Sequence, residues 1–149
     1  MIFVVDTNVC VVANGDTDHA SPACVRACSQ RLLELKRHRI AIDDGMEILR
    51  EYKQRLHTKD EPRDGHAFYR WLVTNLYNQQ RCVLVPMAAF PADPELSGFD
   101  MDDRKFVQVA LAHAERPPIL NAVDSDWRNF EAPLATHGIR LEFLCPEHA

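Results

Sequence analysis

Hydrophobic residues occur along this chain in two kinds of segment. In short runs they are mostly consecutive, although Arg140 and Glu142 interrupt the last run, and these runs predict strands at residues 1–5, 39–42, 82–85, 119–123 and 139–144. In longer segments they are spaced as on one face of a helix, which predicts helices at residues 21–37, 44–56, 66–79, 102–115 and 127–137. Ser21 and Pro22 are typical of the cap and the first residue of a helix.

Several of the short runs are hydrophobic at every position, so we expect both faces of these strands to be covered. Strands of this kind that alternate with helices form a parallel sheet between two helical layers. We therefore predict an α/β fold, a three-layer α/β/α sandwich with a central, mainly parallel sheet of about four or five strands.

Two polar segments interrupt this pattern. Residues 58–64 include a proline and are followed by Gly65, so we expect a loop there. Residues 86–98 contain three prolines and are expected to be irregular surface. The chain has 149 residues, with no repeat and no low-complexity linker, so we expect residues 1–149 to form a single domain.

Composition and charge indicate which classes of protein this chain can belong to. Hydrophobic residues make up 46% and charged residues 26% of the chain, as in ordinary soluble proteins. No hydrophobic run approaches the roughly 20 residues that span a bilayer, so we expect a cytoplasmic protein without a membrane partner. The net charge of −5 argues against a general nucleic-acid coat protein. It does not exclude an enzyme whose carboxylates bind metal ions.

The chain has five cysteines, an odd number, and no CxxC motif, so a disulfide framework is not expected. Cys24 and Cys28, with His19 nearby, resemble part of a zinc site, but a second ligand pair of suitable spacing is missing. We therefore interpret the cysteines as small buried hydrophobic residues.

Two aspartates directly follow predicted strands. Asp6 comes after residues 1–5, and Asp124 comes after residues 119–123. The ends of neighbouring strands lie about 4.8 Å apart, and two carboxylates at that separation repel unless a cation lies between them. Hard divalent cations bind oxygen ligands of this kind. The alternative for Asp6 is an ordinary helix N-cap.

Two predicted helices carry further candidate acids. Asp103 lies in the first turn of the helix at 102–115 and in register with its hydrophobic stripe, whereas Asp100 and Asp102 are interpreted as solvated caps. Glu51 borders the hydrophobic stripe of the helix at 44–56, and Glu47 lies further round, so we favour Glu51.

These helical acids also have ordinary structural interpretations. Asp103 can act as a favourable charge at a helix N-terminus. Glu51 can form a surface ion pair with Arg55, four residues further on. Asp126 is either a fifth acid of the site or the N-cap of the helix at 127–137, and the sequence leaves both open.

Four segments together resemble the PIN domain family, the metal-dependent nuclease fold of VapC-type toxins and RNA-processing factors. They are VVDTNV, EILREY, DDRKFVQVALA and ILNAVDSDW. The resemblance implies the catalytic and metal-binding acids Asp6, Glu51, Asp103 and Asp124, with Asp126 as an additional metal ligand and Asn8 as a support of the first acid. The chain departs from the family at Ala122, where related proteins usually have Thr or Ser.

The resemblance implies an endoribonuclease that cleaves single-stranded RNA with Mg²⁺ or Mn²⁺, through one or two ions about 3.5–4 Å apart. Arg104 and Lys105, beside Asp103, are expected to contact the phosphate backbone of the substrate. Relatives include toxins of toxin–antitoxin pairs, so an antitoxin protein and a homodimer are expected partners. The alternative is a catalytically inactive PIN-like module that serves as a binding partner or scaffold.

Overall fold

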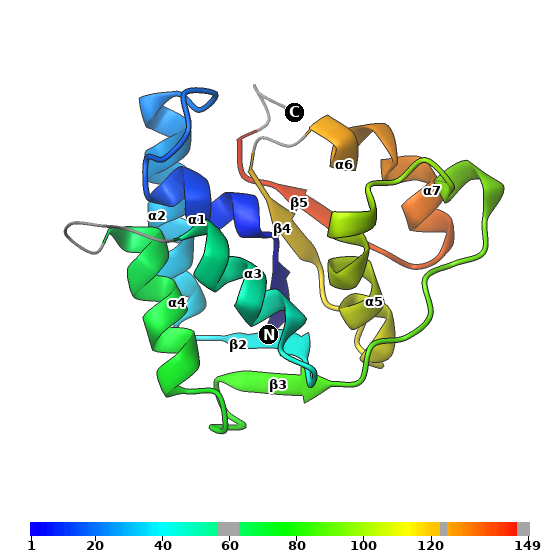
Figure 1. The fold of residues 1–149 in the computed structure, drawn as a ribbon, viewed down its shortest axis with the longest axis horizontal. Helices are drawn as coiled ribbons and strands as arrows, with labels where there is room; N and C mark the ends of the chain where they lie inside the picture. Colours follow the sequence, from blue (N-terminus) through cyan, green and yellow to red (C-terminus); the bar gives the residue numbers. More distant parts are fainter. Residues whose placement is uncertain (57–62, 123–124, 146–149) are drawn as a thin grey trace.

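A computed structural model describes residues 1–56, 63–122 and 125–145 of this chain. Five parallel strands form one sheet in the order β3-β2-β1-β4-β5 (Figure 1). They are β1 (Ile2–Val5), β2 (Arg39–Asp43), β3 (Cys82–Val85), β4 (Ile119–Asn121) and β5 (Leu141–Phe143). Because all neighbours are parallel, the carboxyl ends of the strands meet at one edge of the sheet.

Helices cover the sheet from both sides. In Figure 1, α1 to α4 lie on one side of the strands and α5 to α7 on the other. The helices are α1 (Thr7–Ala13), α2 (Pro22–Leu35), α3 (Glu47–Arg55), α4 (Asp64–Thr74), α5 (Arg104–Ala112), α6 (Ser125–Asn129) and α7 (Glu131–Thr136). Two short 3₁₀ helices, η1 (Pro94–Leu96) and η2 (Met101–Asp103), precede α5. The predicted three-layer α/β class is confirmed.

Large hydrophobic side chains fill the space between sheet and helices. All four residues of the central strand β1 are buried. Phe68 from α4, Phe106 from α5 and Trp127 from α6 are fully buried as well. Burial of each such side chain contributes roughly 1.5–3 kcal/mol, so these residues fix the helices on the sheet. Among the described residues, no helix combines the length and the hydrophobicity that crossing a bilayer requires.

Several element boundaries differ from the sequence-based prediction. Helix α1 was not predicted, because its seven residues include three valines, which favour strands. The helix expected at 127–137 is two short helices that begin at Ser125. The segment 86–98, expected to be surface, places Leu96 in the core. The predicted cap Ser21 is confirmed, since its hydroxyl accepts from the Cys24 N–H.

The prediction that the cysteines form no disulfide is wrong. Cys24, near the start of α2, is bonded to Cys145, which follows β5. The two cysteines are 121 residues apart, so no local sequence pattern indicates that they pair. An odd number of cysteines shows only that at least one thiol stays unpaired, and it does not exclude a disulfide. Cys10 and Cys82 are buried as expected, and burial raises the pKa of the Cys82 thiol to about 11.

We expect reduction of this disulfide to destabilise the chain. Closing a loop of this length restricts the unfolded state, so its loss should lower the free energy of unfolding by about 2–4 kcal/mol. Urea denaturation with and without dithiothreitol measures this difference. In Cys145→Ser the two conditions should give the same midpoint, and equal midpoints in the unmodified chain would contradict the structural role of the bond.

Candidate functional site

The candidate site begins at the carboxyl end of the central strand. The Asp6 N–H donates to the Leu120 carbonyl (2.9 Å), so Asp6 lies where β1 and β4 end side by side. Its side chain is only 3% exposed, and its Oδ2 accepts a hydrogen bond from Trp127 Nε1 at 2.7 Å. Asp6 occupies the N-cap position of α1 but makes no side-chain cap hydrogen bond. The N-cap alternative therefore does not account for this carboxylate.

The next two residues connect Asp6 with other elements. The buried Thr7 hydroxyl donates to Glu51 Oε2 on α3. Asn8 Oδ1 accepts from the Ala122 N–H (2.9 Å) just after β4. The start of α1 thereby joins α3 to the end of β4. Asn8 was expected to support the first acid. Its side-chain oxygen instead holds the backbone of Ala122, which follows β4.

Glu51 is turned toward this edge of the sheet by its neighbour on α3. Tyr52 is fully buried and donates its hydroxyl to the carbonyl of Val5, the residue before Asp6. Glu51 is half-buried and pairs with Lys105 Nζ at 2.8 Å, whereas Glu47 is exposed. Glu51 is therefore the acid of α3 that reaches the site, and its described ion pair is with Lys105 rather than Arg55.

The charges of Asp6 and Glu51 both act on the hydroxyl of Tyr52. Burial raises the pKa of the Tyr52 hydroxyl well above its usual value, and the charges of Cys10, Asp6 and Glu51 raise it further. One phenol thus senses both carboxylates. It stays protonated and remains the donor that holds α3 on β1.

The basic residues beside Asp103 are held by the protein itself. Arg104 donates to the carbonyls of Phe99 and Ser97 (both within 3.4 Å) and lies 4.3 Å over the ring of Phe90. Lys105 contacts the Asp102 carbonyl in addition to Glu51. Both side chains were expected to contact substrate phosphates. In this structure they instead hydrogen-bond to backbone carbonyls of the segment that precedes α5.

Asp103 is the last residue of η2 and directly precedes α5. Its side chain is half-buried and makes no cap hydrogen bond to that helix. Asp100, by contrast, caps η2 through a hydrogen bond from the Asp102 N–H (2.9 Å), as predicted. Asp103 thus occupies the N-cap position of α5 without a side-chain cap hydrogen bond, and it is less exposed than Asp100 and Asp102.

The fourth acid, Asp124, lies outside the described residues. Asp126 is exposed in the first turn of α6, which begins at Ser125, so it is not the N-cap that one alternative expected. Ala122, the departure from the PIN pattern, is fully buried. Among the described residues, the one group of three metal-ligating side chains that meet within 4.8 Å consists of cysteines. The structure thus links Glu51 to Thr7, the neighbour of Asp6, and shows no group of three acids at ligand distance among the described residues.

Sequence reasoning missed a buried acid at the end of β2. Asp43 is fully buried, and its oxygens accept from the N–H groups of Glu47 (2.7 Å) and Ile48 (3.0 Å). This carboxylate therefore caps α3 and fixes the helix that carries Glu51. Its signal was present, because Asp43 ends a hydrophobic strand just as Asp6 does. The hydrogen bond from Trp127 to Asp6 could not be predicted, because the two residues are 121 positions apart in the sequence.

Comparison with known proteins adds no relative. Neither a protein family, nor a curated protein, nor a solved structure matches this chain. The arguments about function therefore rest on the four motif segments, the fold and the contacts described above.

We expect the hydrogen bond between Trp127 and Asp6 to stabilise the fold. A hydrogen bond to a charged group contributes about 1.5–3 kcal/mol, so Trp127→Phe should lower the free energy of unfolding by at least this amount. Urea denaturation of Trp127→Phe, Asp6→Asn and the double variant separates the bond from the change in packing. If Trp127→Phe lowered the free energy of unfolding equally in the unmodified chain and in Asp6→Asn, the hydrogen bond would contribute nothing.

Proposed function

We propose that this chain is a PIN-like, metal-dependent endoribonuclease that cleaves single-stranded RNA. One observation carries the proposal: Asp6 is buried at the end of the central strand, and the hydroxyl of the next residue, Thr7, donates to Glu51 of α3. In an open parallel sheet, ligands bind at the carboxyl ends of strands where the strand order reverses, and β1 lies at such a point. Acids from two distant segments thus belong to this end of the sheet.

The donor type of this site suits a hard divalent cation. Carboxylate oxygens are ligands that Mg²⁺ and Mn²⁺ prefer. Glu51 already pairs with a positive charge, the ammonium of Lys105, which a divalent ion would displace. Asp6 and Glu51 supply the two described ligands, and we assign the remaining positions to Asp103 and Asp124, with Asp126 at the periphery. When bound, the metal would activate water and stabilise the leaving oxygen.

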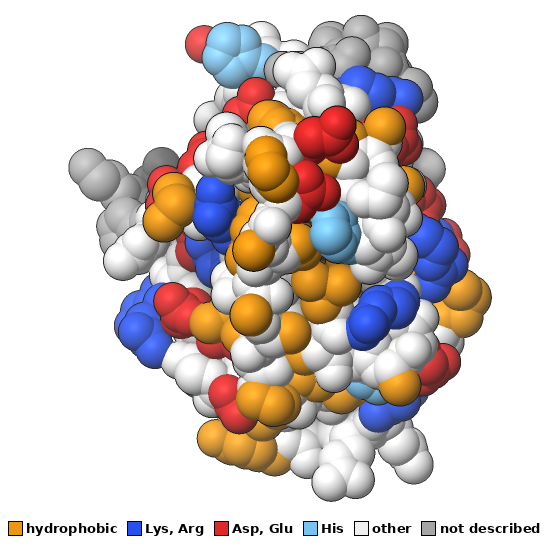
Figure 2. Space-filling view, turned by 90° about the vertical axis from the view of Figure 1, so that its right-hand side faces the viewer, with side chains coloured by type: hydrophobic (Ala, Val, Ile, Leu, Met, Phe, Trp, Pro, Cys, Tyr) orange, Lys and Arg blue, Asp and Glu red, His pale blue; other side chains and the backbone are white. Residues whose placement is uncertain are grey.

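The chain's own groups then have distinct tasks. Trp127 orients the Asp6 carboxylate, and Thr7 orients that of Glu51. The amide Nδ2 of Asn8 is buried and has no hydrogen-bond partner among the described residues, while its Oδ1 holds the backbone after β4. Lys105, once displaced from Glu51, is placed to neutralise a substrate phosphate. Figure 2 shows that basic side chains on the face it displays are scattered rather than gathered in a band.

A second candidate function is an inactive PIN-like binding module or scaffold. The ion pair between Lys105 and Glu51 favours it, because the charge of Glu51 is then neutralised without a metal. If the nuclease is instead the toxin of a toxin–antitoxin pair, as some PIN proteins are, the antitoxin would cover the edge that carries Asp6. A cytoplasmic location and a homodimer belong to the same proposal.

Cleavage of single-stranded RNA tests the proposed activity. Asp6→Asn and Glu51→Gln should each lower the rate of cleavage in Mn²⁺ by roughly 100-fold or more, because each removes a ligand charge. Glu47→Gln, an exposed acid one turn earlier on α3, is the matched control and should keep full activity. EDTA should stop cleavage, and excess Mn²⁺ should restore it. Cleavage that persists in Asp6→Asn or in EDTA would refute the assignment.

Titration calorimetry with Mn²⁺ separates the nuclease from the inactive module. Lys105→Met should bind Mn²⁺ roughly 3- to 10-fold more tightly than the unmodified chain, since a competing cation is removed from Glu51. Lys53→Met, an exposed lysine of α3, should leave the affinity unchanged. Absence of Mn²⁺ binding in both the unmodified chain and Lys105→Met, together with absence of cleavage, would favour the scaffold.

A further inference from the structure

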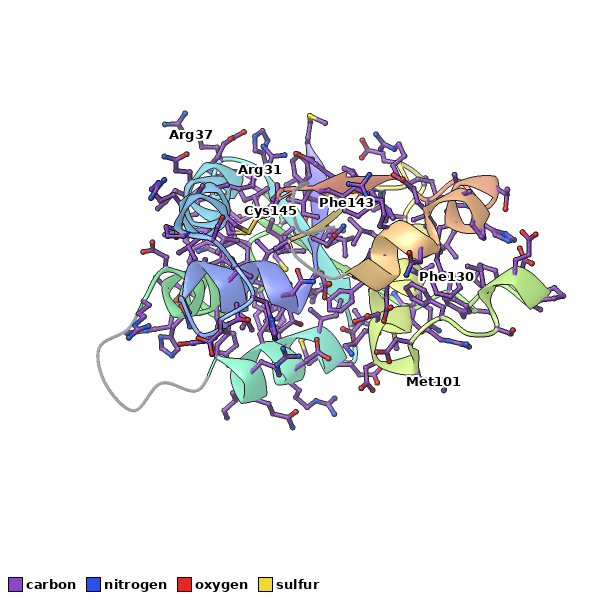
Figure 3. All side chains as sticks on the ribbon, turned by 90° about the horizontal axis from the view of Figure 1, so that it is seen from above. Arg31, Arg37, Met101, Phe130, Phe143 and Cys145 are labelled. Carbon is purple, nitrogen blue, oxygen red and sulfur yellow. A yellow bond between two sulfur atoms is a disulfide. The ribbon has the colours of Figure 1, made fainter. Side chains whose placement is uncertain are left out.

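Three cysteines from opposite ends of the chain meet beside α2. Cys24 and Cys28 lie one turn apart on this helix, and Cys145 follows β5. Their sulfur atoms all lie within 4.8 Å of one another, and all three side chains are buried. Figure 3 shows the disulfide next to the labelled Cys145. We call Cys24, Cys28 and Cys145 the thiol cluster.

One distance in the thiol cluster is that of two sulfur ligands on a single metal ion. Thiolate sulfurs bind d¹⁰ cations such as Zn²⁺ at about 2.3 Å, which places two sulfurs on one ion about 3.8–4.0 Å apart. Cys28 Sγ lies 3.9 Å from Cys145 Sγ. Cys24 Sγ is bonded to Cys145 Sγ and lies within 4.8 Å of Cys28 Sγ, so reduction frees a third thiol in the same group.

We propose that the reduced thiol cluster is a binding site for a soft, thiophilic cation, namely Cu⁺. Soft thiolate ligands select Cu⁺, whereas structural zinc sites require four ligands. In the part of the chain that the structure describes, the group contains three sulfurs and no fourth ligand. His19, the extra ligand that the sequence suggested, is exposed and does not belong to it. Three buried sulfurs form the kind of soft donor set that Cu⁺ prefers.

The disulfide makes this site dependent on redox state. A dithiol transfers two electrons and two protons to the bond between Cys24 and Cys145, giving two thiols, and is itself oxidised to a disulfide. Binding of Cu⁺ then displaces the thiol protons into solution. The oxidised chain has only one of the three sulfurs as a thiol and cannot form the site.

Anaerobic titration of the reduced chain with Cu⁺, against a chromophoric Cu⁺ chelator, tests the proposal. The reduced chain should bind one equivalent, with three sulfur ligands in X-ray absorption spectra. Cys28→Ser should weaken binding roughly 100-fold, as expected for loss of one of three ligands. Cys82→Ser, another buried cysteine outside the cluster, is the matched control and should bind as the unmodified chain does.

The oxidised, unmodified chain is a second comparison that needs no substitution, so the test holds even if Cys28→Ser does not fold. It should bind at least 100-fold more weakly than the reduced chain, by the same loss of ligands. Equal binding by oxidised and reduced chains, or unchanged binding by folded Cys28→Ser, would overturn the proposal. Displacement of Cu⁺ by equimolar Zn²⁺ would overturn the assignment to copper. None of these outcomes depends on RNA cleavage.

Discussion

Burial of a carboxylate at the end of the central strand is the constraint around which the candidate site is organised. A buried charge is tolerated only where hydrogen bonds or opposite charges compensate it. Trp127 of α6 donates such a bond to Asp6. Its ring packs edge-on against the ring of Phe99, with 5.0 Å between the ring centroids. The indole is thus held by the core on one side and by Asp6 on the other. The position of α6 and the orientation of the carboxylate depend on each other.

A second set of contacts fixes Glu51 relative to Asp6. The hydroxyl of Tyr52 ties α3 to β1, and Thr7 ties Glu51 to the start of α1. Lys105 of α5 forms an ion pair with the carboxylate of Glu51. Three helices therefore converge on one edge of the sheet through polar contacts rather than through the hydrophobic core. Such contacts are weak evidence for stability by themselves, but together they restrict the geometry of the edge.

The fold class could be predicted because it depends on local patterns. Short hydrophobic runs mark strands, and they located all five strands. Glu51 was preferred over Glu47 because helical spacing alone determines which of them borders the hydrophobic stripe. Helix α1 was missed because local propensity favours strands for its valines, whereas packing against α2 and α4 makes it helical. The partners of Glu51 and Cys145 could not be predicted, since both contacts join segments far apart in the chain.

Two donor chemistries lie in neighbouring parts of this structure, oxygen at Asp6 and Glu51 and sulfur at Cys24, Cys28 and Cys145. Cys10 on α1 senses both, because its pKa is raised by burial first and then by the charges of Asp6 and Cys28. Hard cations prefer oxygen donors and soft cations prefer sulfur donors, so the two sets select different ions.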